Sequence, residues 1–310
     1  MSQQTTTTNS TIEFNTSNLT NNIITKSTGI FTNSEKPGGI FSNSIPSADY
    51  QQFRTLIPTK KFIAIDGLIG AGKTTLIRLI TDYYRAQGLK VHPIYEPVEM
   101  WQETGALDLF YSDIPAKCYE FQSFVYVTRV KKVIQEVLAH PEAEIFLLER
   151  TVFTDRYIFV EMLRDLLGPI RMAMYAEWWD MWSCINPIHI DKWVLLDVSL
   201  DESLRRIKVR SRNEETGISA EYQTNLRAKH HEFYTRLQET LGSGCKETLG
   251  QQFNSEPSTA LSSANVLVIP PTLMDVDYIT NPEPLKEIAE LIISGLANKQ
   301  ITTIAENNLP

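Results

Sequence analysis

Short apolar runs alternate with longer amphipathic stretches from about residue 60 onward. Five runs consist of residues typical of strands buried on both faces: residues 62–65, 91–95, 145–148, 193–196 and 266–269. The segments between them are long enough for crossover helices. We therefore predict an α/β fold in which a five-stranded parallel sheet is flanked by helices.

The first part of the chain has a different composition. Before residue 58, Thr, Ser, Asn and Gln dominate and core-forming residues are few, which is typical of disorder. We expect residues 1–57 to form a disordered tail and residues 58–310 to form one domain, with a polar surface insertion at about 242–263. A mitochondrial targeting sequence is a weaker interpretation, because acidic residues offset the few Lys and Arg of the tail.

The first predicted strand leads into a glycine-rich loop. Its sequence is Gly67-x-x-x-x-Gly72-Lys73-Thr74, and an amphipathic helical pattern follows. This is the P-loop pattern in the strand–loop–helix context that it requires. Backbone N–H groups of such a loop surround a phosphate, the lysine reaches the outer phosphates, and the threonine hydroxyl binds Mg²⁺. We expect a nucleoside triphosphate to contact Gly67, Gly70, Ala71, Gly72, Lys73, Thr74 and Thr75.

Charged residues stand at the ends of the next two strands. Ligands of an open parallel sheet bind outside the carboxyl ends of its strands, where Glu96 follows the second strand and Glu149-Arg150 the third. Phosphoryl transfer needs a group that orients and deprotonates the acceptor hydroxyl, a carboxylate near the metal, and positive charge for the transition state. We expect Glu149 and Arg150 to supply two of these. The alternative is that Glu149 only caps the following helix or pairs with Arg150.

Arginines cluster after the fourth predicted strand. Arg206 and Arg210 lie one helical turn apart, and Arg212 begins a loop that closes at Gly217. One interpretation is an arginine-rich lid over the phosphates, at about residues 206–217. A solvated charged face explains the spacing equally well.

Several longer motifs carry a family resemblance. They are GLIGAGKTT from Gly67, the Glu96-Pro97-Val98 turn, YEFQSFVYVTR at 119–129, ERTVFTDRYIF at 149–159 and RSRNEE at 210–215. This set resembles the deoxynucleoside kinases, in particular the deoxycytidine and deoxyguanosine kinase branch, over roughly residues 60–240. The resemblance implies a P-loop kinase fold, transfer of the γ-phosphate of ATP to the 5′-hydroxyl of a deoxyribonucleoside, Mg²⁺ as cofactor, and a homodimer.

The resemblance also implies roles for single residues. The family's catalytic carboxylate and its partner arginine match Glu149 and Arg150, and Glu96 matches the glutamate that contacts the 5′-hydroxyl. We favour Glu149 as the general base and keep Glu96 as its rival. We expect Thr74 and Glu149 to hold the Mg²⁺. Further matches are Tyr111 and Glu215 for the sugar 3′-hydroxyl, and Arg206, Arg210 and Arg212 for the lid that holds the donor.

The acceptor base is expected to meet the helix predicted at about 115–139. Gln122 and Arg129 lie two turns apart on one face of it, and the family residue that matches Gln122 hydrogen-bonds the base edge. Arg129 and Asp155 match positions that differ with substrate. An ionised Asp155 only accepts hydrogen bonds, which favours deoxycytidine, deoxyadenosine or deoxyguanosine over thymidine. Val125 instead resembles the thymidine-accepting branch, so the choice is only partly decided.

Composition limits the partners. The 310 residues carry a net charge of −8, which argues against a nucleic-acid polymer, and contain no apolar run of membrane-spanning length. Three scattered cysteines and five histidines show no ligand spacing, so we expect no metal there. We expect a cytoplasmic enzyme with no membrane partner. A Trp-rich helix at about 172–184 is apolar around most of its circumference and fits a homodimer interface or a wholly internal helix equally.

Two other functions are compatible with the motifs. Asp155-Arg156-Tyr157 is similar to the signature of thymidylate kinase, in which case the acceptor is a nucleoside monophosphate. The second alternative is a non-catalytic nucleotide-binding switch protein, with the tail as its effector region. Glu149, Arg150 and the lid arginines argue against it, because nucleotide binding alone needs no base.

Overall fold

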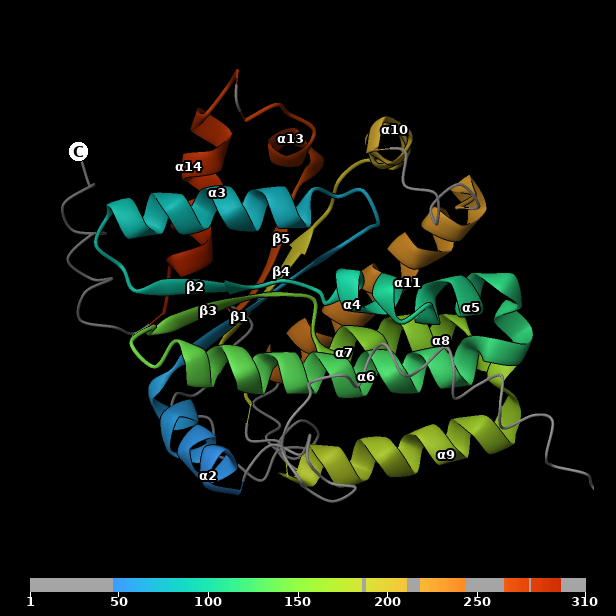
Figure 1. Ribbon diagram of the computed structural model, residues 1–310. Coiled ribbons are helices and arrows are strands. Elements are labelled where there is room, and N and C mark those ends of the chain that lie inside the picture. The colour runs from blue at the N-terminus through green and yellow to red at the C-terminus, as the bar shows by residue number, and fades with distance from the viewer. Residues whose placement is uncertain (1–46, 186–187, 211–217, 243–264, 279, 297–310) are drawn as a thin grey trace, which may run out of the picture. The chain divides into compact units, whose positions relative to one another are not determined.

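The sheet has five strands, all parallel. The computed structural model describes residues 47–185, 188–210, 218–242, 265–278 and 280–296. The strands are β1 (Lys61–Gly67), β2 (Val91–Ile94), β3 (Ile145–Glu149), β4 (Lys192–Leu196) and β5 (Val266–Ile269), in the spatial order β2-β3-β1-β4-β5 (Figure 1). The predicted α/β fold with a five-stranded parallel sheet is confirmed.

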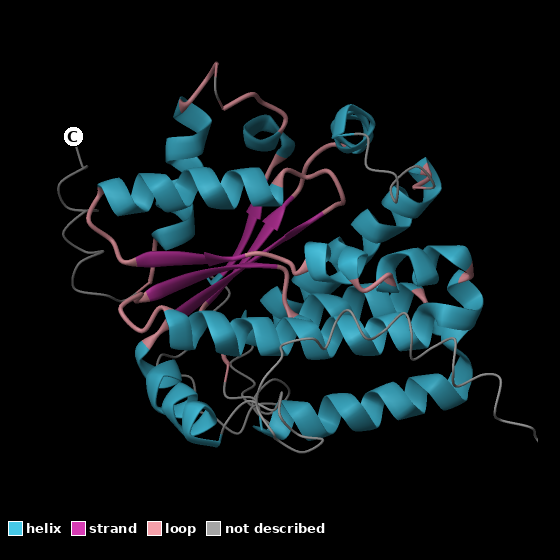
Figure 2. Cartoon of the chain, in the orientation of Figure 1, coloured by secondary structure: helices cyan, strands magenta, loops and turns pink. Residues whose placement is uncertain are grey.

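Helices cover both faces of the sheet, as Figure 2 shows. One face carries α3 (Lys73–Ala86), α13 (Pro271–Met274) and α14 (Glu283–Ile293). The opposite face carries α6 (Ile114–Ala139) and α11 (Ala220–Gly242), and α9 (Arg164–Ile185) packs against α6. The other helical segments are α4 (Val98–Glu103), α5 (Ala106–Ser112), α7 (Val152–Thr154), η3 (Asp155–Phe159), α8 (Val160–Met162) and α10 (Leu200–Arg210). Among the described helices, none is both long and apolar enough to cross a lipid bilayer.

The middle of the sheet forms the core. β3, β4 and all of β1 after its first residue are buried, and the rings of Phe62 and Phe146 stack with centroids 5.5 Å apart. Because helices cover both faces, these strands are largely apolar throughout instead of alternating. The chain crosses from one side of β1 to the other between β3 and β4. In open parallel sheets, ligands bind at such a switch in strand order, which here lies at the carboxyl end of β1.

The predicted boundary between the disordered tail and the domain, at residue 57, is wrong. Instead of continuing as tail to residue 57, the chain forms α2 (Ser47–Leu56) and a short 3₁₀ turn, η2 (Ile57–Thr59). Phe53 and Ile57 are 0% and 1% exposed in the core, and α2 contacts α6. These two residues are four apart, so one helical face buries both, although polar residues flank Phe53 on both sides. Residues 1–46, the lid residues 211–217 and the insertion from 243 onward lie outside the described residues.

Candidate active site

The P-loop joins β1 to α3 at the carboxyl end of the central strand. Gly70 has a φ of 78°, in the left-handed region, and a Cβ there would lie 2.6 Å from the carbonyl oxygen of Ser203. Glycine alone avoids both problems. Gly72 is the N-cap of α3, which begins at Lys73. The helix N-terminus therefore faces the loop, and this arrangement binds phosphate.

Lys73 is buried at the base of the loop. Its Nζ donates to the carbonyl oxygen of Leu68 at 2.9 Å. Burial, together with the nearby charge of Arg150, lowers the pKa of Lys73 to about 7, although three nearby carboxylates oppose this shift. A bound triphosphate adds negative charge at the same place, which favours the ammonium form of the lysine.

Thr74 and Glu149 are in direct contact. The Thr74 hydroxyl donates to Oε1 of Glu149 at 2.8 Å and lies 3.1 Å from Oε2. The register of the sheet pairs Glu149 with Ile65 of β1, so its side chain emerges beside the loop. Burial, and after it the charge of Glu96, raises the pKa of Glu149. The pair offers hydroxyl and carboxylate oxygens at the N-terminus of α3, and oxygen ligands of this kind suit Mg²⁺.

Glu96 lies between two arginines. Its Oε2 accepts from Nη1 of Arg150 at 2.8 Å, and its Oε1 accepts from Nη2 of Arg129 at 2.9 Å. Burial by itself raises the pKa of Glu96, but the two guanidinium groups outweigh it and lower the pKa to about 2. The pKa values of Glu96 and Glu149 are thus moved in opposite directions. This pattern is typical of paired carboxylates with different roles in a reaction.

Arg150 has a strained backbone. Its φ is 60°, and among the described residues it is the one non-glycine residue with a positive φ. This conformation costs about 1–2 kcal/mol for a residue with a Cβ. Its Nη2 donates to the carbonyl oxygen of Gly67 at 3.1 Å, and its guanidinium lies over the ring of Phe159. Strain held in place by surrounding contacts is common at functional sites.

Arg129 and Asp155 form a buried ion pair with two contacts. Nε and Nη2 of Arg129 lie 2.7 and 3.1 Å from Oδ2 and Oδ1 of Asp155. Nη1 of the same arginine donates to the carbonyl oxygen of Glu149 at 3.1 Å. Burial raises the pKa of Asp155, although Arg129 acts in the opposite direction. Asp155 begins the π-helical turn η3, and such turns frequently occur at functional sites.

Gln122 lies on α6, two helical turns before Arg129. Its side chain is 4% exposed, and within the described part of the chain Oε1 has no hydrogen-bond partner. A buried amide oxygen without a partner is uncommon and is available to a ligand. Val125, one turn further along, is also buried. The predicted base-binding face of this helix is therefore buried, as a binding pocket requires.

The predicted lid is described only in part. Arg206 lies on α10 and donates to the carbonyl oxygens of Ala71 at 3.0 Å and Met274 at 2.6 Å. It also pairs with Glu202 one turn earlier at 2.7 Å. Arg206 therefore links α10 to the P-loop and to α13. Arg210 is the last residue of α10, whereas Arg212 and Glu215 lie outside the described residues.

Tyr111 is an exposed residue near the end of α5. It lies near Tyr222, the third residue of α11. Burial raises the pKa of Tyr222 to about 12. The charge of Tyr111 adds to this rise, and the charge of Arg150 opposes it. Tyr222 is thus within electrostatic reach of both the predicted sugar-binding tyrosine and the arginine of the site. The sequence did not indicate Tyr222, because a tyrosine in an amphipathic helix is ordinary.

Two further side chains hold the P-loop and were not found from the sequence. Gln223 donates from Nε2 to the carbonyl oxygen of Ile69 at 2.7 Å, and the Ser203 hydroxyl donates to the same oxygen at 2.8 Å. Both side chains are completely buried. They come from α11 and α10, so the loop conformation depends on the packing of two helices distant in sequence. Nothing in the local pattern distinguishes them from other polar helical residues.

Several known proteins are similar to this chain over more than half of its length. The family model for deoxynucleoside kinase matches residues 63–265. The chain is 34% identical over 201 residues to a probable deoxycytidine kinase of Fowlpox virus (strain NVSL), covering 61% of this chain and 82% of that protein. It is 30% identical over 193 residues to deoxycytidine kinase 2 of Gallus gallus, covering 54% and 71%. It is 25% identical over 199 residues to the mitochondrial deoxyguanosine kinase of Xenopus laevis, covering 57% and 74%.

The matched region contains the P-loop and all the described charged residues at the strand ends. The relatives are kinases of nucleosides, so the comparisons do not favour a monophosphate kinase or a non-catalytic switch protein. The resemblance seen in the sequence is confirmed: the chain belongs to the deoxynucleoside kinase family.

Proposed function

We propose that this chain transfers the γ-phosphate of ATP to the 5′-hydroxyl of a deoxyribonucleoside. One observation carries the proposal: the phosphate loop with Thr74, the two carboxylates Glu96 and Glu149, and Arg150 meet at the carboxyl ends of three neighbouring strands. An acceptor hydroxyl bound beside Glu96 would face the terminal phosphate of a triphosphate in the loop. The names of the relatives, deoxycytidine and deoxyguanosine kinases, support a nucleoside as the acceptor.

Mg²⁺ is the proposed metal, held by Thr74 and Glu149. Their 2.8 Å contact supports this, because both oxygens reach one position beside the phosphate loop. Magnesium there would neutralise charge on the phosphates during transfer. The triphosphate itself would be held by backbone and side chains of Gly67, Gly70, Ala71, Gly72, Lys73 and Thr75, and from the lid by Arg206, Arg210 and Arg212.

Glu96 and Glu149 are assigned different roles. The sequence favours Glu149 as the base, but the contacts support its rival, because Glu149 engages the threonine proposed to bind the metal and a metal-bound carboxylate is a weak base. Glu96 is ionised and bonded to Arg150. A 5′-hydroxyl bound to Glu96 would therefore lie next to positive charge that stabilises the transferring phosphoryl group. Because the transition state of phosphoryl transfer is loose, positioning the hydroxyl contributes more to the rate than strong basicity of the carboxylate that accepts its proton.

The proposed acceptors are deoxycytidine, deoxyadenosine and deoxyguanosine. The Asp155 carboxylate, fixed by Arg129, only accepts hydrogen bonds, and Oε1 of Gln122 also accepts. Cytosine and adenine present an amine to such a carboxylate, and guanine its N–H groups, whereas thymine presents O4, a second acceptor. Tyr111 and Glu215 are proposed to hold the 3′-hydroxyl of the sugar.

The four deoxynucleosides, offered with ATP and Mg²⁺, test the proposal directly. We expect kcat/KM for the best of the three favoured acceptors to exceed that for thymidine by about 100-fold, because thymine O4 would place a second hydrogen-bond acceptor against the buried carboxylate of Asp155. The corresponding deoxynucleoside monophosphates should not be phosphorylated. Thymidine as the best acceptor would reject the substrate assignment, and phosphorylation of monophosphates alone would reject the nucleoside kinase assignment.

The proposed assembly is a homodimer formed through α9. Beyond a break in the helix at Gly168, four apolar side chains at helical spacing are exposed: Ile170 (76%), Met174 (48%), Trp178 (47%) and Met181 (48%). An apolar stripe of this kind typically marks a protein interface. A second copy of the chain fits it best, because a two-fold axis across one helix pairs the stripe with itself.

The mass in solution tests the dimer. Light scattering at micromolar concentration should give twice the chain mass for the wild type and the single-chain mass for Met174→Glu/Trp178→Glu, because the dimer would bury both charges. Val209→Glu is the matched control, since Val209 is 72% exposed on α10. A monomeric wild type would contradict the proposal.

The proposed location is the cytoplasm. The relative from Xenopus laevis is named as mitochondrial, so the family does not fix the compartment. A fluorescent protein fused after Pro310 leaves the first residues unblocked and reports the location. Co-localisation with mitochondria would contradict the cytoplasmic assignment.

A further inference from the structure

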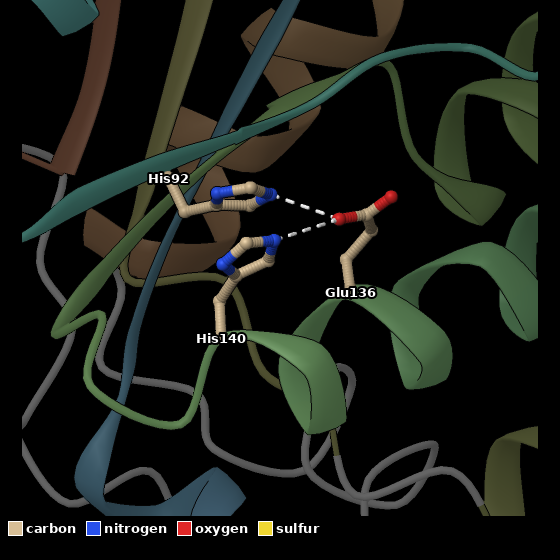
Figure 3. A group of neighbouring side chains, drawn as sticks. All are labelled: His92, Glu136 and His140. Carbon is tan, nitrogen blue, oxygen red and sulfur yellow. Dashed lines mark hydrogen bonds and ion pairs between the residues drawn. The ribbon is translucent and has the colours of Figure 1, made fainter.

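Two histidines and a glutamate meet at the end of the sheet remote from the active site, as Figure 3 shows. His92 is the second residue of β2, whereas Glu96 follows the carboxyl end of the same strand. Glu136 lies in the last turn of α6, and His140 is the C-cap of that helix. The sequence did not indicate this group, because His92 is far from the other two residues along the chain and only the packing of α6 beside β2 brings them together.

The two imidazoles present the same nitrogen to one carboxylate oxygen. Nε2 of His92 lies 2.9 Å from Oε2 of Glu136, and Nε2 of His140 lies 3.7 Å from Oε2. The rings stack with centroids 3.6 Å apart and planes 23° from parallel. Donor atoms bound tetrahedrally to one ion at about 2.0–2.1 Å are about 3.3 Å apart. The two observed separations lie on either side of that value.

Hydrogen bonding alone does not account for the arrangement. The 3.7 Å separation between His140 and Glu136 is too long for a hydrogen bond, so the second imidazole gains none from facing Oε2. The other carboxylate oxygen, Oε1, is held by Lys132 at 2.6 Å, and this leaves Oε2 directed at both rings. Nδ1 of His140 lies 3.4 Å from Glu142, and a carboxylate behind a histidine is the usual orienting partner of a metal ligand.

We propose that His92, Glu136 and His140 form a binding site for a transition-metal ion of the Zn²⁺ type. Two imidazole nitrogens and one carboxylate oxygen are the donor set that Zn²⁺ accepts, whereas Mg²⁺ prefers oxygen ligands alone. The side chains are 15%, 20% and 37% exposed, so an ion enters from solvent and a water molecule completes the coordination. The imidazole ring of His140 must rotate until the ion lies in the plane of the ring, in line with the Nε2 lone pair. The exposed position of His140 at the helix end permits this rotation.

The bound ion would connect the start of β2 to the end of α6. The same helix carries Gln122 and Arg129 two to five turns earlier, so a metal at its end would stabilise the scaffold of the acceptor site without contacting it. Because the ion binds the folded chain and needs all three ligands together, its binding should raise the melting temperature.

Metal titration of the full chain, free of nucleotide and Mg²⁺, tests the proposal. We expect Zn²⁺ to bind at one site by calorimetry and to raise Tm, and Co²⁺ to give the visible absorption of a four- or five-coordinate complex. His140→Ala and Glu136→Gln should each weaken Zn²⁺ binding at least tenfold and abolish the Co²⁺ absorption. Both changes are at partly exposed positions, and unfolding in the absence of metal checks that each variant is folded.

His231→Ala is the matched control. His231 is a partly exposed histidine that also contacts a carboxylate, that of Asp197 at 3.0 Å, and its removal should leave Zn²⁺ affinity and the Co²⁺ spectrum unchanged. Absence of stoichiometric binding in the wild type would overturn the proposal. So would equal affinity in the wild type, His140→Ala and Glu136→Gln, because the ion would then be bound by other groups, such as the cysteines.

Discussion

Replacing Glu149 with Gln should lower kcat about a thousandfold and raise the Mg²⁺ concentration needed for half-maximal activity. The amide keeps the size of the side chain and still accepts the hydrogen bond from Thr74, but it lacks the negative charge proposed to bind the metal. Steady-state rates measured across a Mg²⁺ series report both quantities. Unchanged turnover, or an unchanged Mg²⁺ requirement, would contradict the metal role of Glu149.

Two further variants make this result specific. Glu96→Gln should also lower kcat strongly but leave the Mg²⁺ requirement unchanged, because Glu96 is bonded to Arg150 and Arg129 and not to Thr74. Glu144→Gln is the matched control, since Glu144 pairs with Lys90 before the first residue of β3, at the opposite end of that strand. It should behave as the wild type. If Glu96→Gln raised the Mg²⁺ concentration needed for half-maximal activity as much as Glu149→Gln does, the two carboxylates would act together on the metal.

Removing Asp155 alone should lower the free energy of unfolding by about 3 kcal/mol, whereas removing its partner as well should restore much of the loss. Asp155→Ala leaves the buried guanidinium of Arg129 with two unused donors, because both contacts to the carboxylate are lost. Arg129→Met/Asp155→Ala replaces the pair with apolar side chains. Urea unfolding of the three proteins measures the effect. Glu232→Ala, which breaks exposed pairs with Lys229 and Arg236, should cost about 1 kcal/mol or less.

The same double variant should change the acceptor preference. Without Asp155 the pocket no longer rejects an acceptor group at the position of thymine O4, and Val125 already resembles the thymidine-accepting enzymes of the family. We expect the ratio of kcat/KM for thymidine to that for deoxycytidine to rise by about 100-fold. The ratio is the relevant quantity, because Arg129→Met also removes a contact to Glu96 and lowers turnover of every acceptor. An unchanged ratio would contradict the role of Asp155 in base selection.

The sequence predicted the local parts of the site because their geometry is set by neighbouring residues. The P-loop is one contiguous strand–loop–helix, so its glycines, Lys73 and Thr74 are positioned by the local backbone. Glu96 and Glu149 were also foreseeable, since carboxyl ends of adjacent parallel strands meet at one edge. Their position beside the P-loop follows from that edge.

Other features depended on how distant helices pack. The sequence assigned residues 47–57 to a disordered tail because polar residues dominate there, and only a docking surface on α6 makes Phe53 a core residue. Gln223 on α11 and Ser203 on α10 both donate to the carbonyl oxygen of Ile69. No local sequence pattern distinguishes these two residues from other polar helical residues. Arg129 was expected at the base, but its bond to Glu96 depends on the rotation of α6 relative to β2.

The sequence by itself therefore determined the fold class, the family and the residues at the strand ends, because each of these depends on short-range order: apolar runs, a contiguous motif and the direction of parallel strands. Only the tertiary structure decided which charges share a partner. It bonded Glu96 to two arginines and Glu149 to Thr74, and it brought His92 to Glu136 and His140. The physical reason is that side-chain contacts between segments depend on the position and rotation of whole helices, which many distant packing contacts set together.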